Sequence, residues 1–123
     1  MSNVSFILLY VENVARSAEF YSRLLDQPVP EASPNFALLP VGPGLMLGLW
    51  RRGDVTPAPQ GGPGAGEIAV TFADDEAVDA AHKQWAAQGA SIAQTPAHAD
   101  FGYTFVALDP DGHRIRAFHP AER

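Results

Sequence analysis

The sequence predicts an α+β protein built from two copies of one strand–helix unit, and the similarity of its two halves carries this prediction. Each half begins with a short apolar segment, a turn and an amphipathic stretch, at residues 4–29 (VSFILLYVENVARSAEFYSRLLDQPV) and 66–92 (GEIAVTFADDEAVDAAHKQWAAQGASI). Alignment of the two segments places Val11 on Phe72 and Asn13 on Asp74. Such self-similarity indicates a duplicated unit. Two curled half-sheets that face each other would enclose a mostly apolar space, so we expect a ligand site where the repeats meet.

Length and charge limit the classes of function. A chain of 123 residues has the size of a single domain, in which we assign the first module to 1–52, a linker to 53–65 and the second module to 66–123. So short a chain has little surplus stability, and we expect a homodimer. The net charge of -6, with only eight Lys and Arg residues, argues against a nucleic-acid partner.

Composition also limits the cellular compartments and the kinds of catalytic chemistry that we expect. The chain has no cysteine, so disulfides, thiolate catalysis and cysteine-bound zinc are excluded together. It has no apolar run of about 18 residues and no pattern typical of a secretory signal, so we expect a cytoplasmic protein with no membrane partner.

The first module reads as strand, helix, then short strands. An apolar strand at residues 4–11 is followed by a helix that Asn13 caps and that extends to about Leu25. Three prolines predict that any strand near residues 28–34 is short and peripheral. Residues 36–41 and 45–50 then predict a hairpin around Gly42-Pro43-Gly44. The Pro- and Gly-rich linker follows.

The second module repeats this order. We expect a strand at 67–72, then a helix at 76–88 that Asp74 or Asp75 caps and that Gly89 ends in a left-handed conformation. Strands at 101–108 and 113–118 flank a turn of sequence DPDG, in which glycine takes the positive φ. The segment before residue 101, with His98 and Asp100, is predicted to be a loop.

Two motifs carry a family resemblance. FILLYVENVARSAEFYSRLL (6–25) and FVALDPDGHRIRAFHP (105–120) resemble the vicinal oxygen chelate superfamily, which includes glyoxalase I, extradiol dioxygenases, fosfomycin-resistance enzymes and bleomycin-resistance proteins. The resemblance implies a glyoxalase-like fold, with two paired βαβββ modules forming a curved mixed sheet around a cavity. It does not by itself imply one chemistry, because one fold hosts several.

The resemblance also indicates where a metal would bind. The metal-ligand positions of such enzymes fall here on Phe6, Glu67 and Arg116, and the remaining one lies within 33–52, a segment without Asp, Glu or His. Divalent ions need three or more N or O donors, and a guanidinium repels a cation. We therefore expect no metal, no cofactor and no catalytic residue.

Strand alternation predicts a ligand-binding set instead. Phe6, Leu8 and Tyr10 share the strand face turned away from the helix, and Trp50 ends a strand beside Arg51 and Arg52. Aromatic rings can stack on a planar ligand, whereas Glu67 and Arg116 can pair with each other or with polar groups of the ligand. Each aromatic residue taken singly is also compatible with ordinary core packing. The candidate ligand-binding residues are Phe6, Tyr10, Trp50, Glu67, Phe101, Tyr103 and Arg116.

The remaining candidates are weaker. His82 and Trp85 lie at core spacing on the second helix, and His98 with Asp100 has no neighbouring nucleophile that would support catalysis. The glycine-rich segment 61–66 lacks the Lys and Ser/Thr of a phosphate-binding loop.

The sequence thus predicts a homodimer that binds and sequesters a small planar aromatic compound without chemistry, similar to bleomycin- and phenazine-resistance proteins. Three alternatives stay open. The first is a metal-dependent lyase, isomerase or dioxygenase with ligands elsewhere in the chain. The second is a metal-free enzyme with Glu67 as base and Arg116 stabilising an oxyanion. The third is a ligand-sensing partner of another protein.

Overall fold

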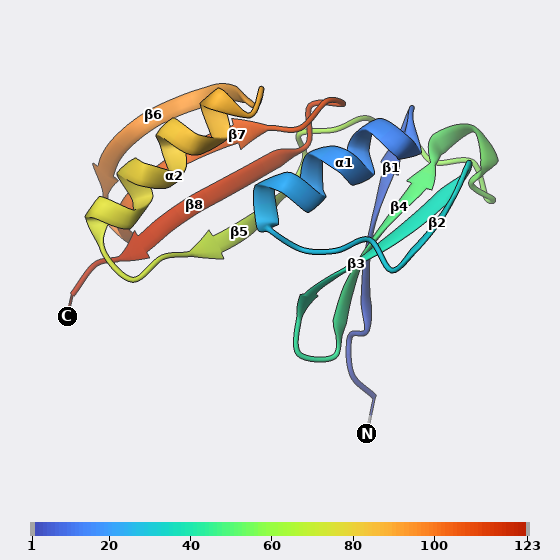
Figure 1. The fold of residues 1–123 in the computed structure, drawn as a ribbon, viewed down its shortest axis with the longest axis horizontal. Helices are drawn as coiled ribbons and strands as arrows, with labels where there is room; N and C mark the ends of the chain where they lie inside the picture. Colours follow the sequence, from blue (N-terminus) through green and yellow to red (C-terminus); the bar gives the residue numbers. More distant parts are fainter. Residues whose placement is uncertain (1, 123) are drawn as a thin grey trace. The chain divides into compact units, whose positions relative to one another are not determined.

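The architecture is α+β, as predicted. The computed structural model describes residues 2–122, which divide into two compact units at the junction of Gly61 and Gly62. Each unit consists of one four-stranded mixed sheet and one α-helix (Figure 1). The boundary between the units falls within the Pro- and Gly-rich segment 53–65.

The first unit contains β1 (Phe6–Val11), α1 (Val14–Leu25), β2 (Glu31–Ser33), β3 (Phe36–Gly42) and β4 (Leu45–Arg51), followed by a 3-10 turn at Arg52–Asp54. Its sheet has the order β1-β4-β3-β2, with β1 parallel to β4 and the other pairs antiparallel. The predicted hairpin and the short strand near the prolines are both confirmed.

Helix α1 begins and ends at local signals in the sequence. The Asn13 side chain accepts a hydrogen bond of 3.0 Å from the Arg16 backbone N–H, which caps the helix as predicted. Asp26 adopts the left-handed conformation (φ 50°) directly after the last turn. Val14, Ala18 and Tyr21 are buried, so the predicted apolar face of the helix covers the sheet.

The second unit contains β5 (Glu67–Thr71), α2 (Asp75–Ala87), β6 (Ser91–Ala99), β7 (Gly102–Leu108) and β8 (Arg114–Pro120). Its sheet has the order β5-β8-β7-β6, again with a single parallel pair, β5 with β8. The prediction of a loop before residue 101 is wrong, because β6 pairs with β7 and carries His98. Most side chains of this edge strand are exposed, so it has no apolar alternation that would identify a strand.

The local predictions in the second unit are otherwise confirmed. Asp74, rather than Asp75, caps α2 by accepting a 2.7 Å hydrogen bond from the Ala77 backbone N–H. Gly89 (φ 99°) follows the helix, and Gly112 (φ 99°) closes the turn between β7 and β8. The Asp109 side chain accepts three backbone hydrogen bonds in that turn, from residues 111, 112 and 113.

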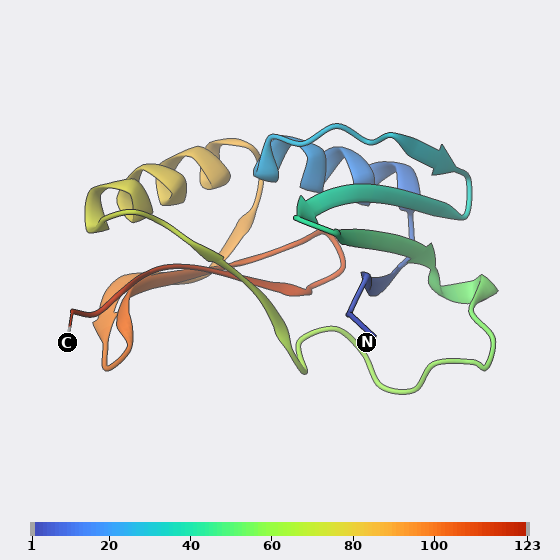
Figure 2. The same cartoon turned by 90° about the horizontal axis from the view of Figure 1, so that it is seen from below.

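In each unit the helix lies on one face of its own sheet (Figure 2). The opposite face, which we call the helix-free face, carries no helix of the same unit among residues 2–122. Neither helix in this range is long and apolar enough to span a bilayer. The two helix-free faces differ in chemistry, and each is described separately below.

Candidate functional site

The helix-free face of the first sheet is apolar along three strands. Register places residues of β1, β4 and β3 side by side, so alternate positions share this face. Phe6 is 52% exposed and Leu8 is 42% exposed, although both are large hydrophobic residues. Exposed apolar surface of this kind is typical of a binding surface. The residues that register places on the face are Phe6, Leu8, Tyr10, Phe36, Leu38, Pro40, Met46, Gly48 and Trp50.

Three aromatic rings gather at one end of this face. The half-buried Trp50 ring lies between the Tyr10 ring (6.3 Å between centroids) and the Phe36 ring (6.4 Å), both in edge-to-face contact. Gly48 allows the Leu8 and Phe36 side chains to approach strand β4 closely, since a Cβ there would collide with Leu8 Cδ2 and lie 3.2 Å from Phe36 Cζ. The Leu8 and Phe36 side chains therefore fill the space above Gly48, next to the Trp50 ring.

The helix-free face of the second sheet carries an ion-pair cluster. Glu67 accepts hydrogen bonds from Arg116 Nε at 2.5 Å and from Arg116 Nη2 at 3.4 Å, so the expected pair is present. Arg114 Nε donates to Glu67 Oε2 at 3.2 Å. Sequence analysis missed Arg114, although it lies two residues before Arg116 and therefore on the same strand face.

Residues at the metal-ligand positions of the resemblance do not fit a metal ion. The Phe6 side chain has no atom that can coordinate a metal ion, and both carboxylate oxygens of Glu67 accept hydrogen bonds from guanidinium groups. The hydrogen bond from Arg116 is the main cause of a lowered Glu67 pKa, and the charges of Arg116 and Arg114 lower it further against the opposing effect of burial. Residues 2–122 contain no cluster of three His, Asp or Glu side chains that could hold a metal ion.

Phe101 extends this cluster with an aromatic surface. The Arg116 guanidinium carbon lies 5.5 Å from the centroid of the Phe101 ring, and the Phe118 ring lies 6.0 Å from it. Phe101 is 46% exposed. The face therefore combines a stacked arginine, exposed ring surface and a fixed carboxylate.

Tyr103 does not lie with these residues, which corrects its predicted place. It belongs to the helix-covered face of β7, where its hydroxyl donates a 2.7 Å hydrogen bond to Asp79 Oδ1 of α2. That bond raises the Tyr103 pKa, with smaller contributions from desolvation and from the charges of Asp79 and Asp75. The ring also contacts the His98 ring in a tilted arrangement, with 4.7 Å between centroids.

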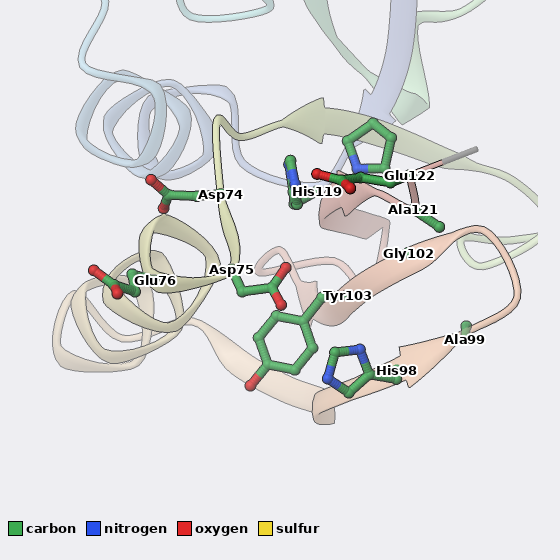
Figure 3. A pocket seen from close by; sticks show the side chains of 11 residues that line it. Asp74, Asp75, Glu76, His98, Ala99, Gly102, Tyr103, His119, Ala121 and Glu122 are labelled. Atoms are coloured by element: carbon green, nitrogen blue, oxygen red, sulfur yellow. The ribbon is translucent and has the colours of Figure 1, made fainter.

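Tyr103 and His98 border a pocket of about 530 Å³ at the N-terminal end of α2 (Figure 3). The pocket contains none of the other predicted ligand-binding residues, and its lining is rich in carboxylates. Asp75 points toward Tyr103 in this view, whereas the side chains of Asp74, the N-cap residue, and Glu76 point away from it. The lining residues are Asp74, Asp75, Glu76, His98, Ala99, Gly102, Tyr103, His119, Pro120, Ala121 and Glu122.

The ion-pair cluster predicts a pH-dependent contribution to stability. A carboxyl whose pKa is lowered on folding stabilises the protein above its ordinary pKa of 4.5 and loses that effect as the pH falls through the folded-state pKa. Glu67→Gln should therefore lower the free energy of unfolding by about 1 kcal/mol at pH 7, and the difference from wild type should shrink below pH 4.5. Urea denaturation across this pH range measures the difference.

Glu19→Gln is the matched control, because Glu19 forms an exposed 3.8 Å pair with Arg23 and should change stability by only a few tenths of a kcal/mol. A Glu67→Gln effect that stays constant from pH 3 to pH 7 would contradict the assigned role of the carboxylate charge.

Comparison with known proteins agrees with this architecture. Residues 3–117 match the Glyoxalase/Bleomycin resistance protein/Dioxygenase superfamily. The chain belongs to this superfamily. The match extends over most of both units and covers the first motif in full and the second up to residue 117.

Individual relatives include a resistance protein. The chain is 30% identical over 112 residues to the phenazine antibiotic resistance protein EhpR of Enterobacter agglomerans, covering 89% of this chain and 85% of that protein. A protein of Agrobacterium tumefaciens, solved by solution NMR, is 41% identical with a TM-score of 0.90, covering 99% of this chain and 100% of that one. A glyoxalase-related enzyme of Fulvimarina pelagi shares the fold at 21% identity, with a TM-score of 0.85 over 97% of this chain and 88% of that one.

Proposed function

We propose that this superfamily member binds and sequesters a small planar aromatic compound, such as an antibiotic, without a metal ion and without chemical turnover. The observation that carries the proposal is the exposed apolar face of the first sheet, with Trp50 set between two other rings. Resistance by sequestration needs only affinity and abundance. The similarity to a protein named for phenazine resistance supports the same class of ligand.

Within this proposal, the aromatic residues supply stacking area and the ion pair supplies polar recognition. Trp50, Phe6 and Tyr10 would contact the ring system, because flat rings pair well in stacked or edge-to-face contact. In the second unit, considered by itself, Phe101 would offer ring surface and Glu67 with Arg116 would offer polar groups to such a compound. Tyr103 is left out of the proposed set, since its hydroxyl is bonded to Asp79 on the other face of its sheet.

Catalysis by Glu67 is disfavoured on chemical grounds. A general base works best with a pKa near the operating pH, whereas the two guanidiniums lower the Glu67 pKa from its ordinary value. A carboxylate held in this way is a weak base and a stable partner for arginine. We therefore propose a binding protein in preference to a metal-free enzyme.

A homodimer is part of the proposal. Val4 is 76% exposed and Ile7 is 37% exposed, and neither is among the residues proposed to contact the ligand. A second copy would remove such surface from water, which stabilises association. Sedimentation equilibrium measures the oligomeric state, and a monomer at micromolar concentration would contradict this part.

A thermal-shift panel tests the binding proposal. Phenazine, bleomycin and mitomycin represent aromatic ligands, and nickel, zinc, manganese and ferrous iron represent metals. A ligand at one hundred times its Kd adds about 2.7 kcal/mol to the free energy of unfolding, which raises Tm measurably. We expect a saturable shift with an aromatic compound, none with the metals, and recovery of the bound compound unchanged by chromatography.

Two outcomes would contradict the proposal. A saturable shift with a metal ion and none with any aromatic compound would favour the metal-dependent enzyme. Conversion of the bound compound would show turnover and exclude simple sequestration.

A further inference from the structure

The two arginines of the ion-pair cluster differ in how many of their donors are already used. Arg116 bonds Glu67 through Nε and Nη2, and its Nη1 donates to Thr104 Oγ1 at 3.2 Å. All three of its nitrogens therefore have protein partners, and its side chain is only 19% exposed. Arg116 therefore links strands β5 and β7 through its hydrogen bonds to Glu67 and Thr104.

Arg114 keeps donors for another molecule. Among residues 2–122 it bonds Glu67 through Nε at 3.2 Å, while its two terminal nitrogens make no further protein hydrogen bond. Its side chain is 40% exposed. A guanidinium that is partly exposed and has two unbonded terminal nitrogens is suited to bind a carboxylate with two parallel hydrogen bonds.

The charge of this face also favours an anion. Register places Glu67, Arg114 and Arg116 on it, and none of the other residues of β5, β7 and β8 on the same face is charged. Strand β6 contains no Asp, Glu, Lys or Arg. Two guanidiniums against one carboxylate leave one positive charge in excess, on a chain whose net charge is -6.

The positive charge lies beside ring surface. Arg114 and Arg116 are two residues apart on β8, a separation of about 6.6 Å along the strand. Arg116 in turn stacks on Phe101, which is 46% exposed. An aromatic ring that stacks at the Arg116–Phe101 end would place a ring carboxylate within reach of Arg114.

We infer that Arg114 is an anion-binding residue and that the ligand is a planar aromatic carboxylate. This inference rests on the proposed function and adds the charge of the ligand and the residue that recognises it. Glu67 is a positioning residue, since its two oxygens hold both guanidiniums in place. The assignment moves recognition of the ligand's polar group from Arg116 to Arg114.

Isothermal titration calorimetry with three probes tests the inference. The probes are phenazine-1-carboxylate, its neutral carboxamide and unsubstituted phenazine, titrated into the full chain at low ionic strength. We expect the carboxylate to bind about tenfold more tightly than the carboxamide, because hydrogen bonds to a charged group contribute more than neutral ones. Arg114→Gln should remove this preference, because it should weaken binding of the carboxylate more than binding of the carboxamide.

Arg23→Gln is the matched control, since Arg23 is an exposed arginine on α1 with one weak ion pair and its loss removes the same charge elsewhere. If Arg114→Gln fails to fold, Arg114→Lys keeps the charge without the planar fork and should reduce the preference several-fold.

The possible failures are distinguishable. Equal binding of carboxylate and carboxamide by wild type, or a preference that survives Arg114→Gln, would overturn the inference and leave the proposed function standing. Absence of binding by all three probes would count against both.

Discussion

Replacement of Trp50 by alanine should weaken the binding of a planar aromatic compound by about 30-fold or more, because a buried aromatic anchor in a binding site contributes about 2 kcal/mol or more. Trp50 is the largest ring on the helix-free face of the first sheet and contacts Tyr10 and Phe36 at its edges. Its loss removes stacking area from the centre of the aromatic group. Calorimetric titration of wild type and variant with the same aromatic compound measures the effect.

Two further variants separate stacking from general damage. Trp50→Phe keeps a ring at this position and should retain most of the affinity. Phe20→Ala removes a half-buried ring from α1, where it contacts Tyr21, and should leave binding unchanged. If Trp50→Ala binds the compound with the affinity of wild type, the helix-free face of the first sheet is not part of the binding site.

Replacement of Phe105 by alanine should lower the free energy of unfolding by about 3–5 kcal/mol, the usual cost of removing a fully buried aromatic side chain. Phe105 is 0% exposed, and its ring lies 5.1 Å from Trp85 and 5.3 Å from His82 between centroids. The variant leaves a cavity between α2 and its sheet. Urea denaturation followed by circular dichroism measures the loss.

Phe101→Ala is the matched control, because it is the same substitution four residues earlier, at a side chain that is 46% exposed. It should cost about 1 kcal/mol, chiefly through its contacts with Phe118 and Arg116. Equal losses in the two variants would show that Phe105 is not the core residue that its burial indicates.

Local signals in the sequence were enough to predict most elements. Asn13 and Asp74 cap the two helices because their side chains accept backbone hydrogen bonds within the same first turn. Gly112 closes the last hairpin because the turn needs a positive φ that glycine adopts without strain. These interactions involve residues a few positions apart, so short windows of sequence contain them in full.

Strand β6 and the position of Tyr103 could not be predicted from short stretches of sequence. β6 is an edge strand with exposed side chains on both faces, so only pairing with β7 defines it. Tyr103 is an aromatic residue in a predicted strand, but whether it lies on the helix-covered or the helix-free face depends on the register of that strand. Its bond to Asp79, 24 residues earlier, follows from the packing of α2 on the sheet.

By itself the sequence determined the α+β class, the duplicated order of elements, the Asn13 cap and the last turn. It left open whether Asp74 or Asp75 caps the second helix and whether Glu67 pairs with Arg116 or with a ligand. Only the tertiary structure decided that Arg116 has all its donors occupied while Arg114 keeps two nitrogens for another molecule. The reason is that Glu67 lies 47 residues from Arg114 and 49 from Arg116 along the chain. How the hydrogen bonds divide between the two arginines depends on the parallel register of β5 and β8, which no local pattern encodes.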